Sequence, residues 1–170
     1  SLHSVLFDGT EALLAGLEAR RLPWGVVTNK PKRFTPGVLA GLGIGHRAAV
    51  AVSGDTTPHA KPHPAPLLFA CEQIGIAPEH ALYVGDDLRD VQAARAAGMP
   101  VVAAGYGYIG QSEITSWQAD AIIERPQDLL TLLPPGAARN AVDCALWDLE
   151  AKQSGKSLAA LAEMPAPKPM

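Results

Sequence analysis

The chain has 170 residues, of which 48% are hydrophobic and 18% charged, and its formal net charge is −3 at pH 7. This composition is typical of a soluble globular protein with one substantial core, and the charge gives no reason to expect nucleic acid or an anionic membrane surface as a partner. No apolar run approaches the roughly 20 residues of a membrane span, no signal peptide is visible, and the two cysteines lack metal-type spacing, so we expect a cytoplasmic protein.

Five short apolar runs are typical of buried parallel strands. They span residues 24–28, 48–53, 81–85, 100–104 and 121–124. Segments of helical period separate most of them, and this alternation predicts an α/β fold with a Rossmann-like parallel sheet and flanking helices. In such sheets ligands bind at the carboxyl ends of the strands. Thr28 and Asp86 both fall at such ends, so we expect them along one edge.

Two of the intervening segments have a clear apolar face. The residues that share it are Leu13, Leu14 and Leu17 in the first segment and Leu67, Cys71 and Ile74 in the second. We expect the second helix to begin after Pro64 and to end near Gly75.

The first predicted strand ends in Thr28 and Asn29. A hydroxyl and successive backbone amides at such a position can hold phosphate oxygens. The alternative is a polar residue that ends the strand and caps the next turn. Taken alone, the two residues favour the alternative; together with the residues below, they favour phosphate binding.

Lys61 precedes the sequence Pro62-His63-Pro64, in which two prolines stiffen the backbone before a predicted helix. A lysine held there can direct its ammonium group at a site on the strand edge. The alternative is an exposed lysine on a loop. We interpret His63 as a residue of the helix start and not as a ligand.

Three carboxylates, Asp86, Asp87 and Asp90, follow the third predicted strand. Adjacent carboxylates repel each other, and a divalent cation relieves this repulsion. Asp90 comes one turn later and could face the same site. Helix capping is the alternative, and it explains Asp87 or Asp90 singly but not the whole set. The pattern therefore favours a Mg²⁺ site.

In order, these motifs resemble the haloacid dehalogenase (HAD) phosphatases, and more narrowly the phosphoglycolate phosphatase-like branch. The resemblance runs from about residue 3 to residue 133. Residues 3–9, 24–31 and 105–109 look especially like the N-acetylmuramic acid 6-phosphate phosphatases. It implies a Mg²⁺-dependent phosphomonoesterase that acts through an aspartyl-phosphate intermediate on a small cytoplasmic metabolite, either phosphoglycolate or N-acetylmuramic acid 6-phosphate.

The resemblance also implies a role for each candidate residue. The catalytic roles fall on Thr28, Asn29 and Lys61, and Mg²⁺ binding falls on Asp86, Asp87 and Asp90. Thr28 and the Asn29 amide would hold the phosphate, and Lys61 would orient the phosphate and the nucleophile. Asp86 would be the direct Mg²⁺ ligand, supported by the other two carboxylates through water or hydrogen bonds.

The nucleophile motif of the family, Asp-x-Asp-Gly-Thr, does not occur in the sequence. Residues 7–10 imitate its end, but Leu6 stands where the nucleophile would be. We therefore expect no meaningful activity of this chain alone, and we interpret this segment as the return from a missing cap. Alternatively, residues 4–7 fill the vacant central strand position, next to the strands that carry Thr28 and Asp86, and offer Asp8 as a surrogate nucleophile. We expect partial filling.

The run Gly105-Tyr106-Gly107-Tyr108 follows the fourth predicted strand. It could shape the mouth of a pocket or form a loop whose rings pack on the core, and the sequence favours neither.

A double proline near residue 134 predicts a boundary between a core at residues 1–133 and a helical appendage at residues 134–170. Residues 138–152 resemble a helix of the dipeptide epimerases in the enolase superfamily, one that holds no catalytic residue there. We expect disorder at residues 165–170. A catalytically silent Mg²⁺- or anion-binding fragment of a phosphatase–epimerase fusion is the alternative function, and an assembly piece whose tail helix docks on a partner is a further one.

Overall fold

The computed structural model describes residues 5–108 and 113–133. The expected α/β fold is confirmed, with parallel strands between helices. In chain order the helices and strands are α1 (Thr10–Ala19), β1 (Gly25–Val27), α2 (Thr35–Gly41), β2 (Val50–Val52), α3 (Ala65–Ile74), β3 (Tyr83–Gly85), α4 (Leu88–Ala96), β4 (Val101–Ala104), β5 (Ala121–Ile123) and α5 (Leu129–Leu132). Short 3₁₀ turns lie at Pro78–His80, Ile114–Trp117 and Pro126–Asp128. No helix of the described residues is long and apolar enough to cross a membrane.

All five predicted strands are present, each slightly shorter than its apolar run. The predicted helix limits at Pro64 and Gly75 also hold, because Pro64 precedes α3 and Gly75 ends it in a left-handed conformation with a φ of 70°. The boundary at residue 134, the tail helix and the expected disorder lie outside the described residues.

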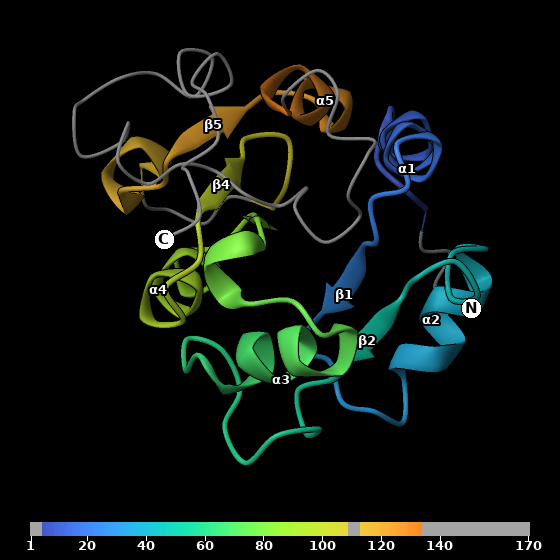
Figure 1. Cartoon of the computed structure of the whole chain (residues 1–170), viewed down its shortest axis with the longest axis vertical. Coiled ribbons are helices and arrows are strands. Elements are labelled where there is room, and N and C mark those ends of the chain that lie inside the picture. The colour runs from blue at the N-terminus through green and yellow to red at the C-terminus, as the bar shows by residue number, and fades with distance from the viewer. Residues whose placement is uncertain (1–4, 109–112, 134–170) are drawn as a thin grey trace, which may run out of the picture.

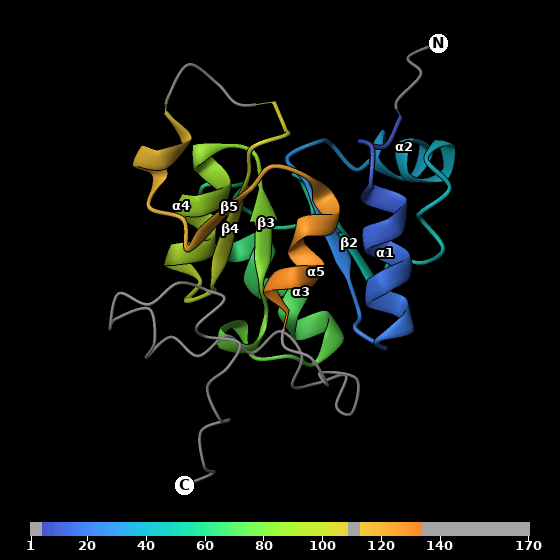
Figure 2. The same cartoon turned by 90° about the horizontal axis from the view of Figure 1, so that it is seen from above.

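Helices cover both faces of the strands, as Figures 1 and 2 show. Val101 and Ala103 of β4 face a cluster built with α3 and α4, which includes Leu67 and Val91. Val102 between them points the other way, into a cluster with α1 and α5. This alternation is what a parallel strand buried on both faces requires.

The strands form two separate groups and not one continuous sheet. β1 pairs with β2, and β3 pairs with β4, which pairs with β5, all in parallel. The sheet is interrupted between β1 and β3, where Figure 1 shows the two groups apart. These are the two strands between which we expected a vacant central position.

The expected partial filling of that position by residues 4–7 is not observed for the part of this segment that the structure describes. Residues 5–7 form no strand, and Val5 is 82% exposed. Leu6 packs beside α1 and α2 instead, and the Phe7 ring lies edge-on against Tyr106 at 5.5 Å. The segment therefore finds its apolar contacts against α1, α2 and Tyr106 and not between the strands. Residue 4 lies outside the described residues.

Candidate active site

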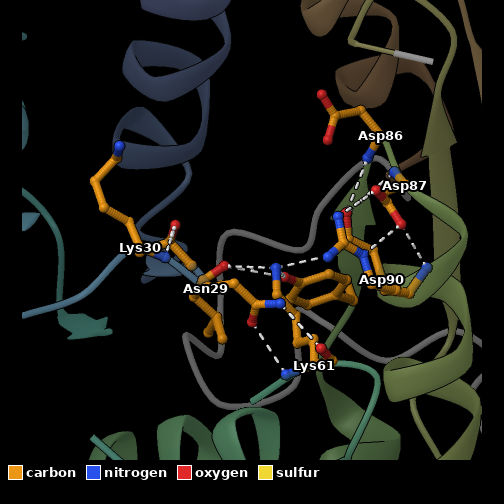
Figure 3. A network of polar contacts seen from close by, with 10 residues as sticks. Asn29, Lys30, Lys61, Asp86, Asp87 and Asp90 are labelled. Carbon is orange, nitrogen blue, oxygen red and sulfur yellow. Dashed lines mark hydrogen bonds and ion pairs between the residues drawn. The ribbon is translucent and has the colours of Figure 1, made fainter. Parts of the chain in front are cut away.

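The candidate site lies where β1 and β3 end. The loops that follow the two strands meet at one edge, together with the loop that carries Lys61 (Figure 3). Of the six candidate residues, Asn29, Lys61, Asp86, Asp87 and Asp90 are drawn there in one polar network.

Lys61 and Asp90 form a buried ion pair at the centre of this network. The Lys61 Nζ donates a hydrogen bond to Asp90 Oδ1 at 2.7 Å, and the two side chains are only 10% and 8% exposed. The same ammonium donates to the backbone oxygen of Val27 at 3.0 Å and to the Tyr83 hydroxyl at 2.9 Å. All three ammonium hydrogens therefore have acceptors, which fixes the cation in place. Lys61 is not the exposed loop lysine of the alternative interpretation.

Asn29 fixes the loop that carries the lysine. Its Nδ2 donates to the backbone oxygen of Lys61 at 2.9 Å, and its Oδ1 accepts from the Lys61 amide at 3.0 Å. The backbone amide of Asn29 makes no hydrogen bond within the described residues, so it is available to an anion. Gly54 approaches this loop so closely that a Cβ at its position would lie 2.3 Å from the backbone oxygen of Asn29.

Thr28 ends β1 with its amide bonded to the Val52 oxygen at 2.9 Å. Its hydroxyl accepts a hydrogen bond from the Lys30 amide at 3.1 Å. This is the turn-capping contact of the alternative interpretation. A hydroxyl can still donate its own hydrogen to an oxygen ligand, so the contact leaves one hydrogen bond open to phosphate.

Asp90 joins the lysine to the β3 loop. Its second oxygen, Oδ2, accepts from the amides of Asp86 and Asp87 at 3.1 and 3.2 Å. Gly85 permits this close approach, because a Cβ there would lie 2.3 Å from the Asp90 Cβ. The carboxylate therefore holds the backbone of the other two acidic residues.

Asp87 caps α4. Its side chain accepts from the Arg89 amide, while Asp90 bonds back to the Asp87 amide in a reciprocal capping box. The Arg89 guanidinium also bonds the Asp87 carboxylate at 2.8 Å, and this hydrogen bond lowers the pKa of Asp87 to about 2. Helix capping, the alternative interpretation, thus accounts for Asp87 and for part of the role of Asp90.

Asp86 differs from its neighbours because its carboxylate points away from the lysine pair, as Figure 3 shows. Its Oδ2 accepts from the Tyr108 amide at 2.8 Å. Gly107 lies so close that a Cβ would be 2.2 Å from the Asp86 Cβ. The aromatic-glycine loop is therefore part of this edge: the Tyr106 ring packs on the core, while Tyr108 is 84% exposed at the rim. The interpretation that the rings pack on the core is confirmed for Tyr106, whereas a role of the loop at the mouth of a pocket stays a prediction.

No group of three or more Asp, Glu, His or Cys side chains in the described residues is arranged to hold a metal ion. Asp87 and Asp90 are engaged with Arg89 and Lys61, which leaves Asp86. One carboxylate fits Mg²⁺, which proteins often bind through one or two carboxylates together with waters and substrate phosphate oxygens.

Two further residues bear on the site. Asp8 is exposed and lines a depression with Leu6, Phe7 and Tyr106, and it makes no side-chain hydrogen bond within the described residues. Sequence analysis missed Tyr83, whose hydroxyl meets Lys61. Burial raises the pKa of Tyr83 well above its ordinary value, so the hydroxyl stays protonated and donates to Val27 at 3.2 Å. The sequence does contain a signal for this role, because Tyr83 places a polar hydroxyl within the apolar run of residues 81–85.

Family models match two parts of the chain. The model for haloacid dehalogenase-like hydrolases matches residues 2–104. The model for the N-terminal domain of mandelate racemases and muconate lactonizing enzymes matches residues 114–162. The second match supports the enolase-superfamily resemblance of the C-terminal part, and it begins before the predicted boundary at residue 134.

Curated relatives and a solved structure agree with the first match. A phosphoglycolate phosphatase of Xanthomonas campestris is 51% identical over 125 residues, covering 73% of this chain and 57% of the relative. An N-acetylmuramic acid 6-phosphate phosphatase of Pseudomonas putida is 40% identical over 147 residues, covering 86% and 62%. The crystal structure of a predicted phosphoglycolate phosphatase from Haemophilus somnus has a TM-score of 0.71 at 35% identity, covering 75% and 56%. The chain thus spans less than two thirds of the length of these proteins.

Proposed function

Because the chain belongs to the haloacid dehalogenase-like hydrolase family, we propose that its core is the phosphate- and Mg²⁺-binding part of a phosphomonoesterase. The observation that carries the proposal is the meeting of three different groups at one edge: the unpaired amide of Asn29, the buried ammonium of Lys61 and the carboxylate of Asp86, which accepts a hydrogen bond from the Tyr108 amide but forms no ion pair within the described residues. An amide, a cation and a metal ligand are the parts that phosphate binding requires.

In this proposal each residue has one task. The Thr28 hydroxyl and the Asn29 amide bind phosphate oxygens, and Lys61 offsets their charge from a position fixed by Asp90. Asp86 is the direct Mg²⁺ ligand. When bound, Mg²⁺ neutralises charge on the phosphate.

Asp87 and Asp90 support Asp86 without binding the metal directly. Asp90 holds the Asp86 amide, and Asp87 fixes the start of α4 through its cap. The proposed task of both is to hold the carboxylate of Asp86 at the strand end.

The substrate class is a small phosphorylated metabolite. The names of the relatives favour phosphoglycolate or N-acetylmuramic acid 6-phosphate. We further propose that residues 1–133 form the phosphatase-like core and residues 134–170 an epimerase-like appendage, as in a fusion of the two kinds of protein.

This 170-residue chain should bind phosphate without hydrolysing phosphate esters. No Asp-x-Asp-Gly-Thr occurs in it, and Asp8 is the acidic residue of its imitation, exposed and without a second aspartate to serve as general acid and base. The positioned cation and metal then only polarise an ester.

Binding and turnover are tested separately. Calorimetric titration with Mg²⁺ in the presence of inorganic phosphate should show binding by the wild type, loss of it in Asp86→Asn, and no change in Asp128→Asn, a control at an exposed ion pair. Equal affinities of wild type and Asp86→Asn would contradict the assigned ligand. Hydrolysis of p-nitrophenyl phosphate should stay at background, and turnover that Asp8→Asn abolishes would establish the surrogate nucleophile instead.

A further inference from the structure

A cluster of three aromatic rings stands beside the candidate metal ligand and has no part in the proposed phosphate site. The Phe7 ring lies 5.5 Å from the Tyr106 ring and 5.6 Å from the Tyr108 ring, at interplanar angles of 69° and 57°. Tyr106 is half-buried, whereas Phe7 and Tyr108 are exposed. Large aromatic side chains that gather at the surface are a common sign of a ligand-binding site.

Two contacts attach this aromatic cluster to Asp86. The Tyr108 amide donates a hydrogen bond to Asp86 Oδ2 at 2.8 Å, so the most exposed ring belongs to a residue that contacts the proposed Mg²⁺ ligand directly. The Tyr106 hydroxyl lies within range of the same charge, because burial and, to a smaller extent, the Asp86 carboxylate raise the pKa of Tyr106. The loop therefore holds its rings next to the place where a phosphate ester would meet the metal.

The aromatic cluster also borders a depression with polar walls. The depression measures about 410 Å³, and its lining includes two rings of the cluster and three charged residues: Phe7, Tyr106, Asp8, Glu124 and Arg125. The carboxylates of Asp8 and Glu124 are exposed and make no hydrogen bond within the described residues. Arg125, by contrast, is paired with Asp128. The depression thus offers unused hydrogen-bond acceptors and two negative charges beside the rings.

Aromatic faces and free carboxylates together match the chemistry of a pyranose ring. One face of such a ring is a layer of C–H groups, whose partly positive hydrogens pack against the negative face of an aromatic ring. The hydroxyls of the sugar are donors, and carboxylates accept hydrogen bonds from them. The same carboxylates would repel a second negative group, such as the carboxylate of phosphoglycolate. The surroundings of Asp86 therefore favour a neutral, hydroxylated group next to the phosphate.

We propose that the aromatic cluster is the subsite for the sugar ring of a hexose 6-phosphate, with the pyranose stacked on Tyr108 and its hydroxyls turned toward Asp8 and Glu124. The inference rests on the proposed function, because it needs the phosphate held at Asp86 and Lys61 as an anchor. In a hexose 6-phosphate only a methylene and the ester oxygen separate the phosphorus from the ring, so the ring must lie close to the metal ligand. Phosphoglycolate presents no ring to the cluster. Of the two kinds of substrate that the proposed function leaves open, the subsite selects the sugar phosphate.

Calorimetric titration of the full chain in the presence of Mg²⁺ compares three probes: N-acetylglucosamine 6-phosphate, phosphoglycolate and inorganic phosphate. The sugar phosphate should bind about threefold to tenfold more tightly than either of the others, which is the gain expected from one stacked ring. In NMR spectra of the complex, saturation of the aromatic protons should transfer to the protons of the pyranose ring. Equal affinity for the sugar phosphate and inorganic phosphate, or no transfer to the ring protons, overturns the inference.

Two substitutions at one position separate the ring from its backbone. Tyr108→Ala removes the ring but keeps the amide that bonds Asp86, so it should lower the affinity for the sugar phosphate about threefold to tenfold while the affinity for inorganic phosphate stays the same. Tyr108→Phe keeps the stacking face and should bind the sugar phosphate as the wild type does. Leu68→Ala, at an exposed position on α3 outside the cluster, is the control for truncating a surface side chain. An equal loss for both ligands in Tyr108→Ala would mean that the ring only supports Asp86, which overturns the subsite.

Failure of the proposed function gives a different result. A wild type that binds neither inorganic phosphate nor the sugar phosphate contradicts the phosphate site itself, and the subsite with it. A wild type that binds inorganic phosphate, but whose preference among the three probes is the same in Tyr108→Ala, overturns the subsite alone and leaves the phosphate site standing.

Discussion

Asp90 connects two parts of the candidate site, and we expect the loss of its charge to destabilise the fold because it leaves Lys61 buried without its partner. Its carboxylate pairs with the ammonium of Lys61 on one oxygen and accepts two backbone amides on the other. Both charged side chains are nearly buried, at 8% and 10% exposed. Asp90→Asn keeps the shape and one acceptor oxygen but leaves the lysine charge without its partner.

The expected cost follows from that burial. Breaking a buried ion pair by removing one member typically costs about 3–5 kcal/mol, because the other charge stays desolvated. Domains of this size have total stabilities of roughly 5–15 kcal/mol, so the loss is a large fraction. Lys61→Met combined with Asp90→Asn removes both charges. We expect the double variant to lose less stability than the two single variants lose together, by up to about 3 kcal/mol.

Urea unfolding followed by far-ultraviolet circular dichroism measures these differences. Asp128→Asn is the matched control, because its ion pair with Arg125 lies at the surface and should be worth at most about 1 kcal/mol. If Asp90→Asn lowers the free energy of unfolding by less than about 1 kcal/mol while the slope of that free energy against urea concentration is unchanged, the pair is not buried and tightly coupled, and the reasoning is refuted.

Three further predictions rest on single contacts. Asp87→Ala should cost about 0.5–2 kcal/mol of stability at neutral pH through the lost helix cap. Because Arg89 lowers the pKa of Asp87 from 3.8 to about 2, the contribution of the charged carboxylate is complete above pH 3.8 and disappears as the pH falls through 2. Urea unfolding of both proteins at pH 7 and at pH 2 would show this. Burial raises the pKa of the Cys71 thiol to about 11, so mass spectrometry should find it alkylated by iodoacetamide at pH 8 only in denaturant, and rapid labelling of the native chain would contradict its burial. Gly85→Ala should lower stability by about 1–3 kcal/mol, since its Cβ would lie 2.3 Å from a carboxylate side chain, whereas Gly37→Ala on open helix surface should be neutral or stabilising; equal effects would mean that the close approach is not rigid.

Much of the candidate site could be placed from local pattern. The apolar runs predicted all five strands, and the rule that parallel strands share a carboxyl edge was enough to bring Thr28 and Asp86 to the same side. Pro64 and Gly75 marked the limits of α3, because proline and glycine act on the backbone next to them. Strand lengths were overestimated by one to three residues, since ladder pairing ends before apolar character does.

The partners within that site were decided by packing alone. Whether Asp90 serves a metal or the lysine depends on a residue 29 positions away, and the participation of Tyr83 depends on which face of β3 it occupies. The position of residues 5–7 was also decided by packing. They contact α1, α2 and Tyr106 and do not lie between β1 and β3. Periodicity and turn chemistry are properties of neighbouring residues, so the sequence by itself determined the elements and their common edge. Hydrogen bonds between distant side chains are settled only when the elements pack, because burial then makes every unpaired charge and amide costly.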